Sequence, residues 1–105
     1  MREGEKERIL LELGGIAEDV YDSLVRDFKT QSLEQIKQAR AAASAGDCAG
    51  GAEIMHSIKG CAANLRLYAA LSAAREAETA FRLESPADNL LPRLDALHAA
   101  VISAG

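Results

Sequence analysis

The sequence has no tryptophan and few other aromatic residues, which make up 4% of its 105 positions. Sheet proteins rely on aromatic and β-branched side chains, whereas the abundant alanine of this chain favours closely packed helices. No segment has the pattern of a convincing β-strand. A chain of this length can bury one core without disulfides or metals, so we expect a single all-α domain over residues 1–105.

Cysteine and long apolar segments are also scarce. Cys48 and Cys61 form neither a Cys-x-x-Cys pair nor a disulfide framework, and no His-x-x-x-His pair occurs, so we expect free thiols and no metal site. No run of about 18 apolar residues is present, and the N-terminal segment is too charged for a signal peptide. We therefore expect a cytoplasmic protein without membrane attachment.

Acidic residues outnumber basic residues, and the formal net charge is −4. Such a chain has no broad electrostatic attraction to nucleic acid, so we expect no nucleic-acid partner. It contains no Gly-x-x-x-x-Gly-Lys loop that would bind ATP phosphates and no nucleophile motif such as Gly-x-Ser-x-Gly. We therefore expect neither an autonomous kinase nor a hydrolase.

Apolar residues recur at helical spacing through most of the chain. The first such segment predicts a short leading helix from Glu5 to Leu13, ended by a pair of glycines. Residues 1–15 thus form a leading helix and a break, and residues 16–105 form the core bundle.

The next helix is expected to start at Ile16. A strict i+4 series predicts its buried face, Ile16, Val20, Leu24 and Phe28, supported by Ala17 and Tyr21 one position on. The spacing changes phase around Thr30 to Ser32, whose side chains can bond to the backbone, and this predicts a kink or a short break. Gly46 is expected to end the helix in the left-handed conformation, and Asp47 to cap the following helix.

The stretch from Ile54 to Leu65 holds the most informative pattern. Positions i, i+4, i+7 and i+11 predict a stripe facing the core: Ile54, Ile58, Cys61 and Leu65. His56 lies on the far side, and its helical neighbours one and two turns away are all small: Ala49, Ala52, Gly60 and Ala63. Because glycine in a helix costs up to about 1 kcal/mol relative to alanine, Gly60 points to close approach by another molecule. Lys59 brings a positive charge near the ring.

Two more helices are expected. The first runs from Leu67 to Leu83 with four residues inward: Leu71, Ala74, Ala77 and Phe81. Its opposite face carries Arg75, Glu78 and Arg82, which on their own predict a solvated face with an ion pair between Glu78 and Arg82. The closing helix has four inward residues: Leu90, Leu94, Leu97 and Val101. Pro92 is acceptable only in its first turn, which places the start near Asp88 or Asn89.

The pattern His-x-x-Lys-Gly, formed by His56, Lys59 and Gly60 and followed by small residues, resembles the histidine-containing phosphotransfer (HPt) domain of multistep phosphorelays. The resemblance covers most of the chain and implies an antiparallel four-helix bundle, here with the short N-terminal helix added. It implies that His56 carries a phosphoryl group on its ε nitrogen between aspartates of receiver domains. Lys59 would then neutralise the phosphate oxygens.

The resemblance also assigns roles to neighbouring residues. Glu78 stands 22 residues after His56, where relatives place a Gln or Glu that hydrogen-bonds the ring, and Arg82 matches a position that is basic in some relatives. The surface of small residues, Ala49, Ala52, Gly60 and Ala63, would admit the receiver's loops. Arg66 stands where many relatives have glycine; either the helix junction differs locally, or the arginine adds charge to the docking face.

The implied partners are response-regulator receiver domains or a hybrid sensor histidine kinase, acting on a monomer. This chain is expected to bind no cofactor, because the metal ion, Mg²⁺, and the acceptor aspartate come from the receiver. The alternative is a helical adaptor that docks a partner through the same surface without being phosphorylated. Phosphate loading of His56 separates the two. His98 lacks the motif and is expected to be structural or incidental.

Overall fold

The computed structural model describes residues 3–105, and these form five helices and no strand. The helices are α1 (Glu3–Glu12), α2 (Glu18–Ala45), α3 (Cys48–Asn64), α4 (Tyr68–Arg82) and α5 (Ala87–Ile102). The predicted all-α class is confirmed. Residues 1 and 2, which belong to the expected leading segment, lie outside the described residues.

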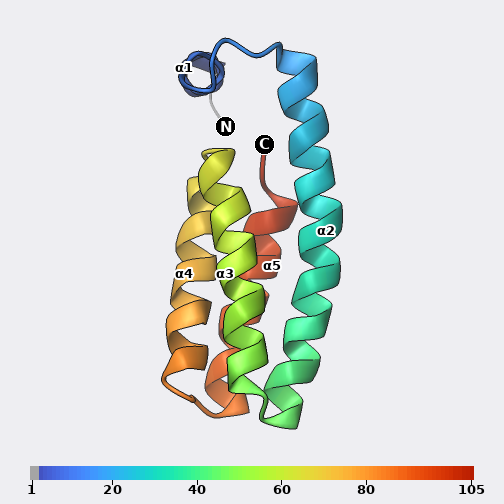
Figure 1. Ribbon diagram of the computed structural model, residues 1–105, viewed down its shortest axis with the longest axis vertical. Coiled ribbons are helices and arrows are strands. Elements are labelled where there is room, and N and C mark those ends of the chain that lie inside the picture. The colour runs from blue at the N-terminus through green and yellow to red at the C-terminus, as the bar shows by residue number, and fades with distance from the viewer. Residues whose placement is uncertain (1–2) are drawn as a thin grey trace.

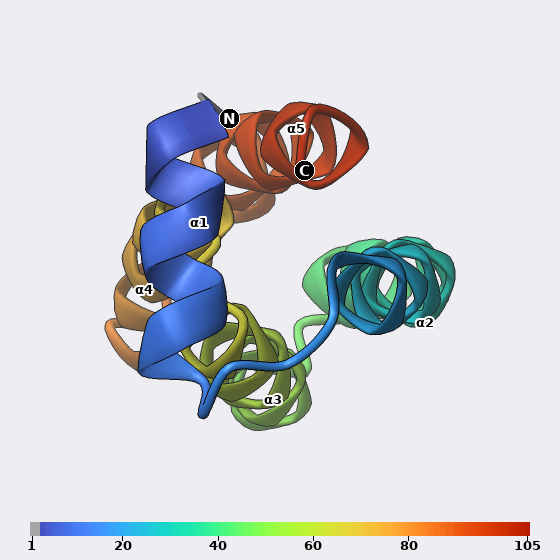
Figure 2. The ribbon, with the colours of Figure 1, turned by 90° about the horizontal axis from the view of Figure 1, so that it is seen from above.

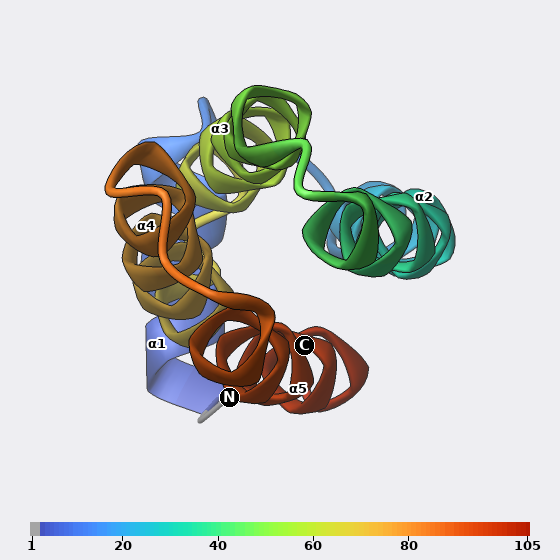
Figure 3. The same ribbon diagram turned by 90° about the horizontal axis from the view of Figure 1, so that it is seen from below.

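The four longer helices surround a common core. α3 packs against α2 and α4, and α5 packs against α4 and α2, so the contacts close a ring. Figure 1 shows that consecutive helices run in alternating directions along the long axis, and Figure 3 shows the same four helices from one end. Short connections enforce this path, because they leave no length for a crossover.

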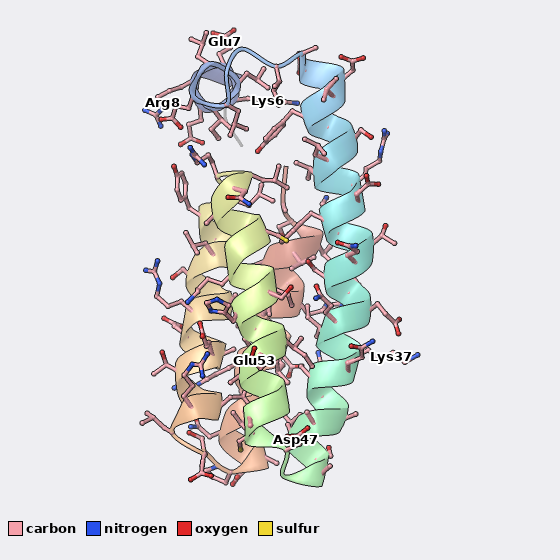
Figure 4. The ribbon with its side chains drawn as sticks, viewed as in Figure 1. Lys6, Glu7, Arg8, Lys37, Asp47 and Glu53 are labelled. Atoms are coloured by element: carbon pink, nitrogen blue, oxygen red, sulfur yellow. The ribbon has the colours of Figure 1, made fainter. Side chains whose placement is uncertain are left out.

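α1 lies across one end of the other helices rather than along them (Figure 2). It buries Ile9 at 3% exposure, and Lys6 forms ion pairs to two carboxylates of α2, the nearer being Asp22 at 2.6 Å. Figure 4 shows Lys6 beside the first turns of α2. The chain leaves α1 through Gly14 and Gly15, both with positive φ, so the predicted glycine stop is confirmed.

α2 is continuous, and the predicted break around Thr30 to Ser32 is wrong. Thr30 Oγ1 donates to the carbonyl of Arg26 within the helix, and Ser32 is buried at 1% exposure. Counting this small serine as a core residue restores a regular three-and-four spacing of buried positions: Tyr21, Val25, Phe28, Ser32, Ile36, Ala39 and Ala43. The apparent change of phase came from treating Ser32 as a polar interruption.

The predicted buried face at the start of α2 is only partly right. Val20 and Leu24 are 48% and 43% exposed, whereas Tyr21 and Val25, one position later, are buried. A strict i+4 series advances about 40° around a helix at each step, so it drifts away from any one face. Of that series, Phe28 is buried in the core and Ile16 is partly buried against it.

The turn into α3 has the predicted caps. Gly46 has a φ of 75° and ends α2, and the Asp47 side chain accepts a hydrogen bond from the Gly50 N–H at 3.0 Å. Figure 4 shows Asp47 at this turn. The predicted core stripe of α3 is only partly right, because Ile58 is buried but Cys61 is exposed.

Small residues account for the error in α3. The buried residues of α3 are Gly51, Ala52, Met55, Ile58 and Ala62. Ile54 and Leu65 are only partly buried against the core. Glycine and alanine let neighbouring helices approach closely, and a prediction weighted by hydrophobicity ranked these residues too low.

The last two helices follow the predicted pattern closely. Three of the four residues expected to face inward from α4 are buried, and Leu71 is partly buried. All four residues predicted for the inner face of α5 are buried: Leu90, Leu94, Leu97 and Val101. However, α5 begins at Ala87, so Pro92 lies in the second turn rather than the first and removes one backbone hydrogen bond there.

Candidate functional site

His56 projects from the middle of α3 beside α4. Its side chain is 61% exposed, and Nδ1 lies 3.2 Å from Oε2 of Glu78, a residue of α4 whose side chain is only 8% exposed. A carboxylate can only accept, so in the neutral ring Nδ1 carries the hydrogen and Nε2 keeps its lone pair. Among the described residues, no hydrogen bond engages Nε2. The ring therefore offers a nucleophilic nitrogen to solvent.

Glu78 is the centre of a charged cluster that also contains Lys59 and Arg82. The Lys59 ammonium lies 2.6 Å from Oε1, and Arg82 donates to Oε2 through Nη2 at 2.7 Å and through Nε at 3.0 Å. Burial alone would raise the pKa of Glu78, but hydrogen bonds and charge from the two cations outweigh burial and lower that pKa to about 2. Glu78 is therefore ionised at neutral pH and holds both cations next to His56.

Helical spacing and one close contact assemble this cluster. Lys59 follows His56 by three residues and Arg82 follows Glu78 by four, so each pair shares a helix face. The spacing between α3 and α4 is fixed where Gly51 meets Phe81, because a Cβ at position 51 would overlap the Phe81 ring. Our reading of the sequence missed the role of Gly51. Its signal is a glycine near the start of a helix, because glycine allows a neighbouring side chain to approach the backbone closely.

A family model of the Hpt domain matches residues 23–104. The chain belongs to the Hpt domain family. No curated protein and no solved structure matches it significantly. The matched range of this Hpt domain contains α3, α4, α5 and most of α2, and hence both His56 and Glu78, whereas α1 lies outside it.

The surface around His56 in this Hpt domain is less extensive than predicted. Gly60 is exposed, and a side chain added there would meet no atom within 4 Å. Ala49 is exposed and Ala63 is half-buried. Ala52, however, is 1% exposed and belongs to the core, so its predicted place on the docking surface is wrong. Ala52 lies on the side of α3 that faces the other helices, so its side chain packs in the core.

Arg66 occupies the turn between α3 and α4, with a φ of 59°. That left-handed conformation favours glycine, the residue that the family resemblance leads us to expect here. The arginine adopts it while Nη1 donates to the carbonyls of Ala63 and Asn64, and Nε pairs with Glu12 of α1 at 3.4 Å. The side chain is thus bound to the helix junction and to α1 rather than to the His56 cluster.

Two further findings concern ligands and membranes. Within residues 3–105, no three His, Cys, Asp or Glu side chains come together in a group that could hold a metal ion. No helix in the described part of the chain combines the length and the apolar character needed to cross a membrane.

Proposed function

We propose that His56 accepts a phosphoryl group from a phosphorylated aspartate of a receiver domain and donates it to an aspartate of another. The observation that carries this proposal is the hydrogen bond between His56 Nδ1 and the ionised, buried Glu78. It orients an exposed ring and leaves Nε2 as the nucleophile. Membership of the Hpt family supports the same reaction.

The proposed transfer balances without a protein base. The Nε2 lone pair attacks phosphorus, the bond from phosphorus to the aspartyl oxygen breaks, and the electron pair leaves with the aspartate as a carboxylate. The ring keeps its Nδ1 hydrogen and becomes positively charged. Glu78 stabilises that charge through the hydrogen bond that it already accepts. In the reverse step the ring leaves as neutral imidazole.

Lys59 and Arg82 would supply positive charge to the transferring group. Both form ion pairs with Glu78. The Lys59 side chain is 27% exposed and the Arg82 side chain 52%, so both can reach toward a phosphoryl group on Nε2. Ala49, Gly60 and Ala63 leave room for the receiver's loops. Arg66 has a smaller part in docking than its charge suggested, because it is bound to Glu12.

The proposed partners are receiver domains and a hybrid sensor kinase that supplies the phosphate through its own receiver. The receiver would contribute Mg²⁺ and the acceptor aspartate, and this chain would contribute no cofactor and no ATP site. We further propose that residues 16–105 act as a monomeric, antiparallel four-helix bundle in the cytoplasm.

The test is labelling by a panel of phosphorylated receiver domains, scored as acid-labile, base-stable phosphate on this protein. His56→Gln should abolish the label, while His98→Gln, the matched control, should leave it intact. Label that persists in the His56 variant would overturn the proposal. A receiver that binds the wild-type protein tightly and never labels it would instead establish the adaptor alternative.

A further inference from the structure

The two oxygens of the Glu78 carboxylate have different partners. Oε1 lies 2.6 Å from the Lys59 ammonium, which reaches it from α3, the neighbour of α4 in Figures 1 and 3. Oε2 lies 3.2 Å from Nδ1 of His56 and accepts hydrogen bonds from Arg82, through Nη2 at 2.7 Å and through Nε at 3.0 Å. The oxygen that orients the histidine ring is therefore held by Arg82, and the other oxygen by Lys59.

Hydrogen bonds, rather than the torsions of Glu78, set the plane of its carboxylate. The last torsion of a glutamate side chain has broad minima, so the carboxylate turns until its oxygens find partners. Lys59 offers a point charge on a flexible stem, which can follow either oxygen. The guanidinium of Arg82 is planar, and two of its donors converge on Oε2. Arg82 is therefore the partner that fixes the position of Oε2.

Phosphoryl transfer would separate the two cations of this cluster. Lys59 lies one helical turn from His56, so a phosphoryl group on Nε2 draws its ammonium away from Oε1. The Glu78 side chain is 8% exposed, and a buried carboxylate that loses its cations is costly. Burial raises the pKa of Glu78, whereas the hydrogen bonds and charges of Lys59 and Arg82 lower it. Once Lys59 has moved, Arg82 keeps the carboxylate ionised and in place.

We propose that Arg82 is a positioning residue, which acts through Oε2 of Glu78 to keep the His56 ring in its Nδ1–H form while Lys59 moves to the phosphoryl group. This role rests on the phosphotransfer proposed for His56 and separates the tasks of the two cations. The charge of Arg82 also favours a phosphoryl group nearby, but its Nε and Nη2 hydrogens are committed to Glu78. Lys59 stabilises the transferring group, and Arg82 preserves the geometry of the ring.

The first test is the tautomer of His56 in the unphosphorylated protein, read from ring ¹⁵N chemical shifts with the ring neutral. Arg82→Ala should shift the ring toward the Nε2–H form, because Oε2 is no longer held beside Nδ1. Arg82→Lys returns the charge without the fork and should restore only part of the wild-type population. Lys59→Ala should leave the tautomer as in the wild type, because Lys59 binds the other oxygen.

The second test is a double-mutant cycle, measured as single-turnover transfer from a phosphorylated receiver domain. Arg82→Ala should slow transfer by about tenfold in the wild-type background, the usual order of effect for a residue that orients a functional histidine through a second group. In the Glu78→Ala background the same change should cost less than about threefold, because no carboxylate is left to position. Lys59→Ala should slow transfer in both backgrounds, because its target is the phosphoryl group. Arg26→Ala, at an exposed position on α2, is the charge control and should transfer normally.

Two results would overturn the positioning role: a wild-type tautomer in Arg82→Ala, or a cost of Arg82→Ala that is equal in both backgrounds. The second result would mean that Arg82 acts on the phosphoryl group directly. The Arg82 side chain is 52% exposed, so its variants should fold, and Arg82→Lys keeps the charge in case the alanine variant does not. The tautomer is measured without a receiver. It therefore tests Arg82 even if no receiver labels the wild type, and the two failures are distinguishable.

Discussion

The Lys59 ammonium lies 2.6 Å from the Glu78 carboxylate, across the interface between α3 and α4. The cation proposed to stabilise the phosphoryl group is thus already paired with the carboxylate that orients the accepting ring. A phosphoryl group on Nε2 would compete with Glu78 for Lys59. Glu78 would keep Arg82 and the His56 ring as partners during this exchange, so its buried carboxylate would not be left unpaired. Lys59 can therefore serve both states of the histidine.

Glu78 should control the tautomer of His56. Glu78→Ala removes the acceptor of the Nδ1 hydrogen, so the ring should shift from the Nδ1–H form toward the Nε2–H form, in which Nε2 has no lone pair for attack. Phosphoryl transfer should slow accordingly. Glu78→Gln keeps an acceptor oxygen and should be milder. Ring ¹⁵N chemical shifts of His56, measured with the ring neutral, report the tautomer directly. Identical shifts in wild type and Glu78→Ala would show that the hydrogen bond does not select it.

Lys59 should contribute charge rather than orientation. Lys59→Ala should lower the transfer rate by about tenfold or more, since about 1.4 kcal/mol of lost transition-state stabilisation is a factor of ten. Lys59→Arg should recover part of the rate, because the charge returns with a different reach. Single-turnover transfer from a phosphorylated receiver measures both. Lys37→Ala, on the exposed side of α2 (Figure 4), is the control and should transfer normally. A Lys59→Ala variant as fast as this control would contradict the role.

The lowered pKa of Glu78 predicts how stability depends on pH. Its folded pKa of about 2 lies below the ordinary glutamate pKa of 4.5, so the ionised carboxylate contributes stability above about pH 4.5 and loses that contribution as the pH falls toward 2. The difference in unfolding free energy between wild type and Glu78→Gln should be largest near neutral pH and should shrink through this window. Denaturant unfolding followed by circular dichroism at several pH values measures it.

Glu53→Gln is the control for that experiment. Glu53 is exposed on α3 (Figure 4), and no ion pair engages it among residues 3–105. Its variant should track the wild type at every pH. A difference for Glu78→Gln that stays constant from pH 7 to acid would show that Glu78 is not held ionised by its neighbours.

Two glycines of α3 should respond in opposite directions to alanine. Gly51→Ala places a methyl group against the Phe81 ring, and overpacking of this kind typically costs about 1–3 kcal/mol, which exceeds the gain in helix propensity of about 1 kcal/mol. Gly60→Ala enters open space and should stabilise the protein by up to about 1 kcal/mol. Chemical denaturation of the two variants compares them directly. A Gly51→Ala variant as stable as Gly60→Ala would mean that this contact does not set the spacing of α3 and α4.

Much of the fold could be predicted from the sequence because helical periodicity is a local property. The inner face of α5 and the caps at Gly46 and Asp47 depend on residues within one or two turns, and they were predicted correctly. The face of α2 was not, because polar Ser32 is buried while Val20 and Leu24 are exposed. Burial of a small polar residue depends on which helix packs against it, and spacing alone does not reveal that.

In the candidate site, too, contacts within one helix could be predicted and contacts between helices could not. Lys59 and Arg82 could be placed near His56 and Glu78 from spacing within single helices. The contact between His56 and Glu78 joins two helices, and the residues alone favoured a solvated face for Glu78; its place beside the ring came from the family resemblance. The pairing of Lys59 with Glu78 went unpredicted because it depends on how α3 is rotated against α4.

The turn at Arg66 couples the leading helix to the helix that carries the histidine. One guanidinium binds both the last carbonyls of α3 and Glu12 of α1, in a backbone conformation that costs a non-glycine residue about 1 kcal/mol or more. Pulling α1 away from the bundle would free one side of that guanidinium and leave the strained turn with fewer bonds to hold it. The conformation of the turn at the end of α3 should therefore depend on whether α1 is docked, although α1 lies outside the matched family region.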